Sequence, residues 1–126
     1  MVAVGTLLRV GTGRRAVSRG LWSTLRRVRV LVVVNPNATS TRRRTRDVLL
    51  AALSGAADVT IAQTTHRNHA EELAADALDG DVEAVVAYGG DGTVNEVVNG
   101  LMARGPGSHV PLLGVLPGGS ANVFAR

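Results

Sequence analysis

Residues 87–101 read AYGGDGTVNEVVNGL, a glycine-rich turn between an apolar run and an amphipathic one. The apolar run predicts a buried strand, and the segment after the turn predicts a helix because its apolar residues recur at helical spacing. Gly89, Gly90 and Gly92 permit positive φ and let backbone N–H groups approach a ligand closely. A helix that begins near Thr93 directs the positive end of its dipole to the same place. The stretch therefore predicts a phosphate-binding turn that joins a strand to a helix.

A carboxylate, Asp91, stands in the middle of this turn. It is not expected to touch phosphate directly, because two anions in contact repel one another unless a cation or a proton lies between them. Three partners remain open for it: Mg²⁺, a hydroxyl of a substrate or a ribose, and a backbone amide of its own turn. The first two predict a nucleotide site in which Asp91 positions a metal ion or accepts a proton during phosphoryl transfer.

Outward from this stretch, short apolar runs alternate with segments of helical spacing. This alternation predicts an α/β fold, namely a doubly wound, mainly parallel sheet with helices on both faces, similar to a Rossmann domain. Buried strands are expected at residues 30–34, 59–62, 84–87 and 112–116, and helices at residues 41–55, 69–79 and 93–103. The helix residues expected to face the core are Val48, Leu49, Ala52 and Leu53, then Ala70, Leu73, Ala74, Ala77 and Leu78, then Val94, Val97, Val98, Leu101 and Met102.

Polar residues gather in the loops that follow these strands, where doubly wound sheets bind their ligands. In the loop at residues 64–69, Asn68 is expected to cap the next helix, whereas His66 and His69 are too few for a metal site and are expected to shape the loop. Thr93 to Glu96 fits a capping box, and this interpretation of Glu96 is weighed equally with a direct contact to a ligand. The other loops with this polar character lie at residues 35–40, 89–93 and 117–122.

Charge is divided unevenly along the chain. Residues 1–46 carry eleven arginines and no acid, whereas residues 47–126 carry three arginines and ten acidic residues. The net charge of +4 therefore does not describe a uniformly basic surface, and one Trp, one Tyr and one Phe leave little for bases to stack on. We expect no nucleic-acid partner. With no cysteine and no apolar stretch near the roughly 20 residues that span a bilayer, we expect a cytoplasmic protein.

The basic segment at residues 1–27 is expected to be a disordered leader, followed by a nucleotide-binding α/β domain at residues 28–126. An alternative stays open for the leader. Its residues Val17, Leu21 and Leu25, with Val28, recur at helical spacing, and such a face among arginines could rest on an anionic membrane. The protein would then be peripheral at the membrane.

Three motifs together resemble the diacylglycerol kinase catalytic domain family, which includes sphingosine and ceramide kinases and is related to NAD kinases. They are NP at residues 35–36, GGDGT at 89–93 followed by NE at 95–96 and NGL at 99–101, and PGGSANVFAR at 117–126. The resemblance implies binding of ATP with Mg²⁺ and transfer of the γ-phosphoryl group to a lipid hydroxyl, such as that of diacylglycerol at a membrane surface. It implies a catalytic role for Asp91, and a nucleotide site formed by Asn35, Thr65, Gly89, Gly90, Gly92, Thr93, Glu96, Gly119 and Ser120; it assigns no metal ligands.

The chain departs from the family's pattern in two ways. Family members commonly have Thr and Asp where this chain has Ser120 and Val123, and they carry a second, β-rich domain that holds the lipid. Because the sequence stops at Arg126, we expect an N-terminal half that is weakly active or inactive by itself. Two alternatives remain open: a non-catalytic nucleotide-binding module, and an enzyme similar to NAD kinase.

Overall fold

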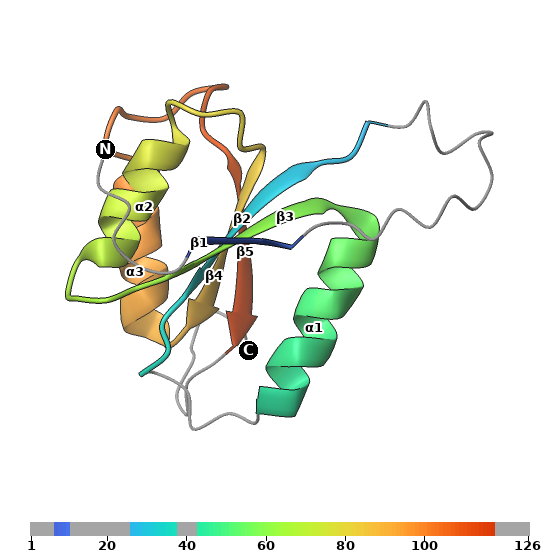
Figure 1. Cartoon of the computed structure of the whole chain (residues 1–126). Helices are drawn as coiled ribbons and strands as arrows, with labels where there is room; N and C mark the ends of the chain where they lie inside the picture. Colours follow the sequence, from blue (N-terminus) through green and yellow to red (C-terminus); the bar gives the residue numbers. More distant parts are fainter. Residues whose placement is uncertain (1–6, 11–25, 38–42, 118–126) are drawn as a thin grey trace.

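The computed structural model describes residues 7–10, 26–37 and 43–117 (Figure 1). Its elements form one sheet with helices on both faces, which confirms the predicted α/β fold. In chain order they are β1 (Leu7–Val10), β2 (Arg29–Val34), α1 (Arg43–Ala56), β3 (Asp58–Gln63), α2 (His69–Ala77), β4 (Ala84–Gly89), α3 (Asp91–Leu101) and β5 (Leu112–Pro117).

The sheet has the strand order β1-β3-β2-β4-β5. Strands β3, β2, β4 and β5 are parallel, with Val32 of β2 opposite Ile61 of β3 and Val86 of β4. The four predicted strands correspond to these four, each within two residues of its expected ends. Parallel pairing places all four carboxyl ends at one edge of the sheet, which is the lower edge in Figure 1.

Strand β2 lies at the centre of two hydrophobic clusters because its five consecutive apolar residues point alternately to the two faces. Leu31 and Val33 pack in the cluster that α2 and α3 cover. Val30, Val32 and Val34 pack in the cluster on the opposite face, against which α1 places Leu50 and Leu53. Figure 1 shows this layering, with α2 and α3 on one side of the sheet and α1 on the other.

The α1 face was predicted correctly at Leu53, but two of the other residues expected to face the core are exposed. Val48 is 67% exposed and Ala52 is exposed, whereas the half-buried Leu50 and Leu53 point to the sheet. Four apolar residues in a row, LLAA at 49–52, are compatible with more than one helical face, so periodicity alone does not fix the rotation of the helix about its axis.

Three other residues that were expected in the core are also exposed. Met102, expected to be buried, is 44% exposed because α3 ends at Leu101 and the chain turns away. Strand β5 was expected to be buried, but Leu112 and Leu113 are exposed. In the described part of the sheet β5 pairs only with β4, and a strand with one neighbour buries less of its surface than a central one.

The prediction of a disordered leader is wrong at Leu7–Val10, which forms β1 and pairs antiparallel with β3. Without β1, the outer edge of β3 would present unpaired N–H and C=O groups, so a short apolar segment gains backbone hydrogen bonds there. The domain boundary at residue 28 stays a prediction. Most of the helical pattern proposed within residues 17–28 lies outside the described residues. Within residues 7–10, 26–37 and 43–117, no helix is both long and apolar enough to cross a membrane.

Helices α2 and α3 approach one another closely at Gly100. A Cβ atom added to Gly100 would overlap the Glu71 carbonyl oxygen and would lie 2.8 Å from the Ala74 Cβ. Gly100→Ala should therefore lower the free energy of unfolding by roughly 1–3 kcal/mol, as overpacking does, although alanine is the better helix former. Urea denaturation checks this prediction. Gly55→Ala in α1 is the matched control, since an added Cβ there meets nothing within 4 Å, and an equal loss in both variants would contradict the explanation.

At the opposite edge of the sheet, Glu83 joins two segments. Its Oε2 accepts a hydrogen bond from the Arg29 backbone N–H at 3.0 Å, and its Oε1 pairs with Arg26. The backbone hydrogen bond from Arg29, aided by the charges of Arg26 and Arg29, lowers the pKa of Glu83 below its ordinary value of 4.5. A carboxylate with a depressed pKa in the folded state contributes stability above that ordinary value, and the contribution is lost as the pH falls through the folded-state pKa.

Glu83→Gln should therefore reduce stability at pH 7 and flatten the loss of stability between about pH 5 and about pH 3. The midpoint of urea unfolding, measured across this pH range, tests the prediction. Asp81→Asn is the control, because it removes an exposed carboxylate only two residues away. Parallel pH profiles for the wild type and Glu83→Gln would refute the assignment.

Candidate functional site

The loops that follow β2, β3 and β4 lie side by side at the carboxyl edge of the sheet. Backbone hydrogen bonds continue beyond the strands, from Asn35 N–H to the Tyr88 carbonyl at 3.1 Å and from Thr64 N–H to the Val34 carbonyl at 2.9 Å. These bonds hold the starts of the three loops at fixed spacing. The N-termini of α2 and α3 lie at the same edge, so the positive ends of two helix dipoles converge there.

A cavity of about 280 Å³ lies between these loops. It brings together residues that are far apart in the sequence, from the loops after β2 and β3 and from α3, and its lining is mostly polar. The lining residues are Asn35, Asn37, Thr64, Thr65, His66, Arg67, Thr93 and Glu96.

Four of the predicted nucleotide-binding residues therefore share one cavity, namely Asn35, Thr65, Thr93 and Glu96. The predicted residues Gly89, Gly90, Asp91 and Gly92 are not among its lining residues, but they form the turn that leads from β4 into α3 and so stand directly before Thr93. Gly119 and Ser120 lie outside the described residues.

Asn37, Thr64, His66 and Arg67 line the cavity but were not predicted individually. The available signal was their position in the loops at residues 35–40 and 64–69, directly after two buried strands. Which side chains of a loop turn inward depends on backbone angles that composition does not reveal.

The glycine-rich turn has a different geometry from the expected one. Among the described glycines only Gly105 has positive φ, and Gly90, the N-cap of α3, is extended with φ −81° and ψ −174°. Gly89, Gly90 and Gly92 therefore do not use the positive φ that glycine permits. Gly89 is required by space, because an added Cβ would lie 2.5 Å from the Thr93 Oγ1. At Gly90 and Gly92 an added Cβ would meet nothing within 4 Å, so the backbone there faces open space.

Helix α3 begins at Asp91, two residues before the expected start, and the Val94 N–H donates to the Gly90 carbonyl at 3.2 Å. Thr93 therefore lies inside the first turn rather than at the N-cap, and the capping-box interpretation of Glu96 is wrong. The Thr93 hydroxyl is buried and accepts a hydrogen bond at 3.4 Å from the Asn35 Nδ2. This bond ties the loop after β2 to α3.

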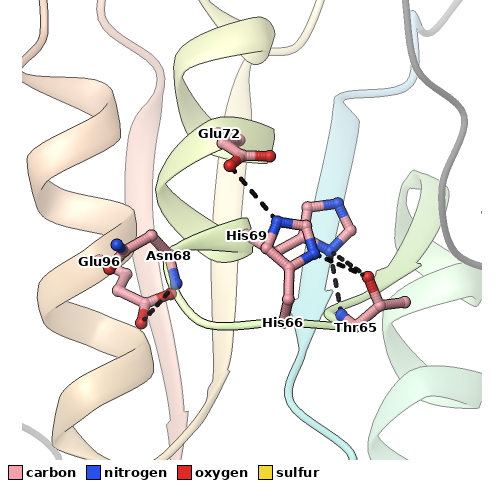
Figure 2. A network of polar contacts seen from close by, with 6 residues as sticks. All are labelled: Thr65, His66, Asn68, His69, Glu72 and Glu96. Carbon is pink, nitrogen blue, oxygen red and sulfur yellow. Dashed lines mark hydrogen bonds and ion pairs between the residues drawn. The ribbon is translucent and has the colours of Figure 1, made fainter.

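Glu96 reaches a different helix (Figure 2). Its Oε1 accepts a hydrogen bond at 3.2 Å from the backbone N–H of Asn68, the N-cap residue of α2. Asn68 has left-handed backbone angles, φ 65° and ψ 3°, and its side chain makes no capping hydrogen bond. The expected capping by the Asn68 side chain is thus wrong, although the helix begins where it was expected. Glu96 supplies an acceptor at the start of α2 from across the cavity.

His66 and His69 shape the loop at residues 64–69, as predicted. Their rings stack with centroids 4.4 Å apart, and the Thr65 hydroxyl lies within 3.2 Å of a ring nitrogen of each. His66 Nε2 also lies 3.3 Å from the Glu72 Oε1 (Figure 2). Among the described residues, no group of three or more His, Asp or Glu side chains is arranged to hold a metal ion.

Asp91 is half-buried in the first turn of α3, where the helix dipole favours a carboxylate. The edge of the sheet thus combines helix N-termini, the guanidinium of Arg67, hydroxyls, and the carboxylates of Asp91 and Glu96. Amides and a cation suit an anionic ligand, whereas carboxylates suit a hydroxyl or a cation. A phosphorylated ligand that also carries hydroxyl groups or a metal ion matches both sets.

Comparison with known proteins also indicates a site for a phosphorylated ligand. Residues 29–126 match the family model of the diacylglycerol kinase catalytic domain. A diacylglycerol kinase of Staphylococcus haemolyticus is 39% identical over 97 residues, which are 75% of this chain and 28% of that protein. A diacylglycerol kinase of Bacillus subtilis is 46% identical over 63 residues, which are 50% of this chain and 20% of that protein.

Solved structures agree with the sequence matches. A crystal structure of a diacylglycerol kinase from Bacillus anthracis superposes with a TM-score of 0.64 at 32% identity. The similarity covers 81% of this chain and 37% of that one. The chain therefore spans between a fifth and two fifths of the length of these relatives.

The bond between Glu96 and Asn68 can be tested directly. Glu96→Ala removes the acceptor and should speed hydrogen exchange of the Asn68 amide, because that N–H would exchange its carboxylate partner for water. Glu96→Gln retains an oxygen at the same reach and should stay close to the wild type. Asn95→Ala, an exposed neighbour on the same helix, is the control. Unchanged Asn68 exchange in Glu96→Ala would show that the bond does not hold the loop.

Proposed function

The chain belongs to the diacylglycerol kinase catalytic domain family, and on this premise we propose that it forms the nucleotide-binding part of an ATP-dependent lipid kinase. The observation that carries the proposal is the convergence of the GGDGT turn, the N-terminus of α3 and the polar cavity at one edge of the sheet. The relatives are named as kinases of diacylglycerol, which supports a lipid hydroxyl as the acceptor.

The phosphates of ATP fit the start of α3. Gly90 and Gly92 leave space in front of the backbone, since an added Cβ meets nothing there, and a phosphate can approach the N-terminal amides of the helix. Thr93, Thr65 and Asn35 offer hydroxyl and amide groups that suit the remaining polar atoms of a nucleotide. Gly89 acts indirectly, by allowing the turn to pack against Thr93. Gly119 and Ser120, outside the described residues, are proposed to contribute to the same site.

The cavity is small for a whole nucleotide. Its volume of about 280 Å³ lies at the lower end of the roughly 300–1,000 Å³ typical of small-molecule sites. The described residues therefore enclose part of the ligand, and we propose that the phosphates lie outside this volume, along the turn at Gly90 and Gly92.

Asp91 has the position and charge to serve the transfer step. As the lipid hydroxyl oxygen forms its bond to the γ-phosphorus, the bond to the bridging oxygen of ADP breaks and the hydroxyl proton passes to the Asp91 carboxylate. Mg²⁺ bound with ATP would supply positive charge beside the phosphates, and Asp91 is the residue of the turn that would hold it if it does not act as the base. Glu96 is proposed to brace the wall of the site through Asn68.

The acceptor is proposed to be diacylglycerol or a similar lipid, met by a cytoplasmic protein at the membrane surface. Because the chain spans only a fifth to two fifths of the relatives' length, we expect it to bind ATP by itself but to transfer phosphate slowly. The two properties are measured separately, by calorimetric titration with ATP and Mg²⁺ and by transfer from γ-labelled ATP to dispersed lipid. The acceptor panel contains diacylglycerol, sphingosine, ceramide and NAD.

Asp91→Asn should reduce the transfer rate by about 10²–10⁴-fold, the usual contribution of a positioned general base, while the dissociation constant of ATP changes much less. Asp76→Asn is the matched control, because it makes the same charge change at an exposed position near the far end of α2. Equal transfer by the wild type and Asp91→Asn would remove Asp91 from the chemistry. Labelling of NAD instead of lipid would favour the NAD kinase alternative, and ATP binding without any transfer would favour a non-catalytic module.

A further inference from the structure

His69 is an unusual first residue for a helix, because its side chain is turned inward and is only 4% exposed. The family resemblance gave it no role, and it is not among the residues that line the cavity. Its Nδ1 nevertheless accepts a hydrogen bond at 3.0 Å from the backbone N–H of Thr65, which does line the cavity. The Thr65 hydroxyl lies 3.2 Å from the same nitrogen (Figure 2).

We propose that His69 is a positioning residue of the nucleotide site, which fixes the backbone amide of Thr65 at the cavity wall through an unprotonated Nδ1. This inference rests on the proposed function in one respect, that the ligand positioned by Thr65 is ATP.

The geometry determines the tautomer of His69. A backbone N–H can only donate, so the Nδ1 atom that receives the Thr65 N–H carries a lone pair and no proton. A neutral imidazole then carries its proton on Nε2. Because Nδ1 has one lone pair in the ring plane, the backbone amide occupies it, and the Thr65 hydroxyl can direct its proton elsewhere.

The second histidine offers the hydroxyl a partner. His66 Nδ1 lies 3.0 Å from the Thr65 Oγ1, and the His66 Nε2 lies 3.3 Å from the Glu72 Oε1. Thr65 thus lies beside two stacked imidazoles, with the buried one holding its backbone and the exposed one beside its hydroxyl. Two separate contacts on a single residue limit both the position and the rotation of Thr65.

The buried ring also connects the loop to the core. Ala70, next to His69, is fully buried in the cluster beneath α2, and the following turn is anchored by Ala74. Movement of the His69 ring is therefore resisted by packing, whereas Thr65 itself is exposed and lies in a loop. The hydrogen bond at Nδ1 therefore links Thr65, a loop residue, to the packed start of α2 and restricts its movement.

A pair of amide substitutions separates positioning from packing. The side-chain amide of Asn can place an oxygen where Nδ1 lies, whereas the longer Gln places its amide near the position of Nε2. His69→Asn should keep slow hydrogen exchange of the Thr65 amide and an ATP affinity within about threefold of the wild type. His69→Gln should lose the exchange protection and weaken ATP binding by about three- to tenfold, which corresponds to the net contribution of one or two hydrogen bonds. A role in filling volume alone predicts the reverse order, since Gln is closer to His in size.

The tautomer gives an independent readout. In ¹⁵N spectra of the wild type, the Nδ1 of His69 should have the shift of an unprotonated ring nitrogen and Nε2 that of a protonated one. A protonated Nδ1, or a Thr65 amide that exchanges equally fast in the wild type and His69→Gln, would overturn the inference whether or not ATP binds.

If the exchange and tautomer results hold but the wild type does not bind ATP, the proposed function fails and the positioning of Thr65 stands. If ATP binds equally to the wild type, His69→Asn and His69→Gln, the positioning role in the nucleotide site is refuted.

Discussion

The parallel pairing of β2 with β3 on one side and β4 on the other is the constraint on which the site depends. All five residues Val30–Val34 are buried, so β2 cannot slip by one position without exchanging its two faces between the helix layers. The register places Val34, the last residue of β2, beside Gln63, the last residue of β3, and Tyr88, the next to last of β4. The burial of β2 in the core thus fixes the spacing of the polar loops that follow β2, β3 and β4.

Hydrogen bonds also connect those loops to one another and to the helices beside them. Asn35 reaches Thr93, Glu96 reaches Asn68, and His69 holds Thr65, so each wall of the cavity is bonded to a neighbouring or a distant segment. None of these bonds is deeply buried on both sides, and each is expected to contribute little to global stability. Their combined effect is to restrict the polar groups to one arrangement before any ligand arrives, which lowers the entropic cost of binding.

The sequence was sufficient for the four parallel strands and for the order of the helices between them, because a continuous apolar run such as residues 30–34 is typical of a buried strand. It failed where a pattern allowed several answers. LLAA at residues 49–52 is compatible with more than one helical face, and Thr93 to Glu96 matches a capping box although α3 starts at Asp91. It also failed where the partner lay far away in sequence: β1 pairs with β3, and Glu96 bonds the Asn68 backbone, and neither contact leaves a local signal. Only half of the residues that line the cavity were predicted, because a motif identifies a loop but not the orientation of the side chains in it.

The three glycines of the GGDGT turn separate into two kinds once the backbone is known. Gly89 is explained within the protein, because a side chain there would collide with Thr93. Gly90 and Gly92 have negative or unremarkable backbone angles and open space where a side chain would stand, so neither strain nor internal packing requires glycine. A side chain at either position would instead occupy the space in front of the N-terminal amides of α3. The absence of side chains there is best explained by something outside the chain that must come close to the backbone, and for an anion at a helix N-terminus close approach is the source of the binding energy. Under the proposed function, Asp91 between the two open positions is the side chain of the turn that would meet the cation or the hydroxyl accompanying such an anion.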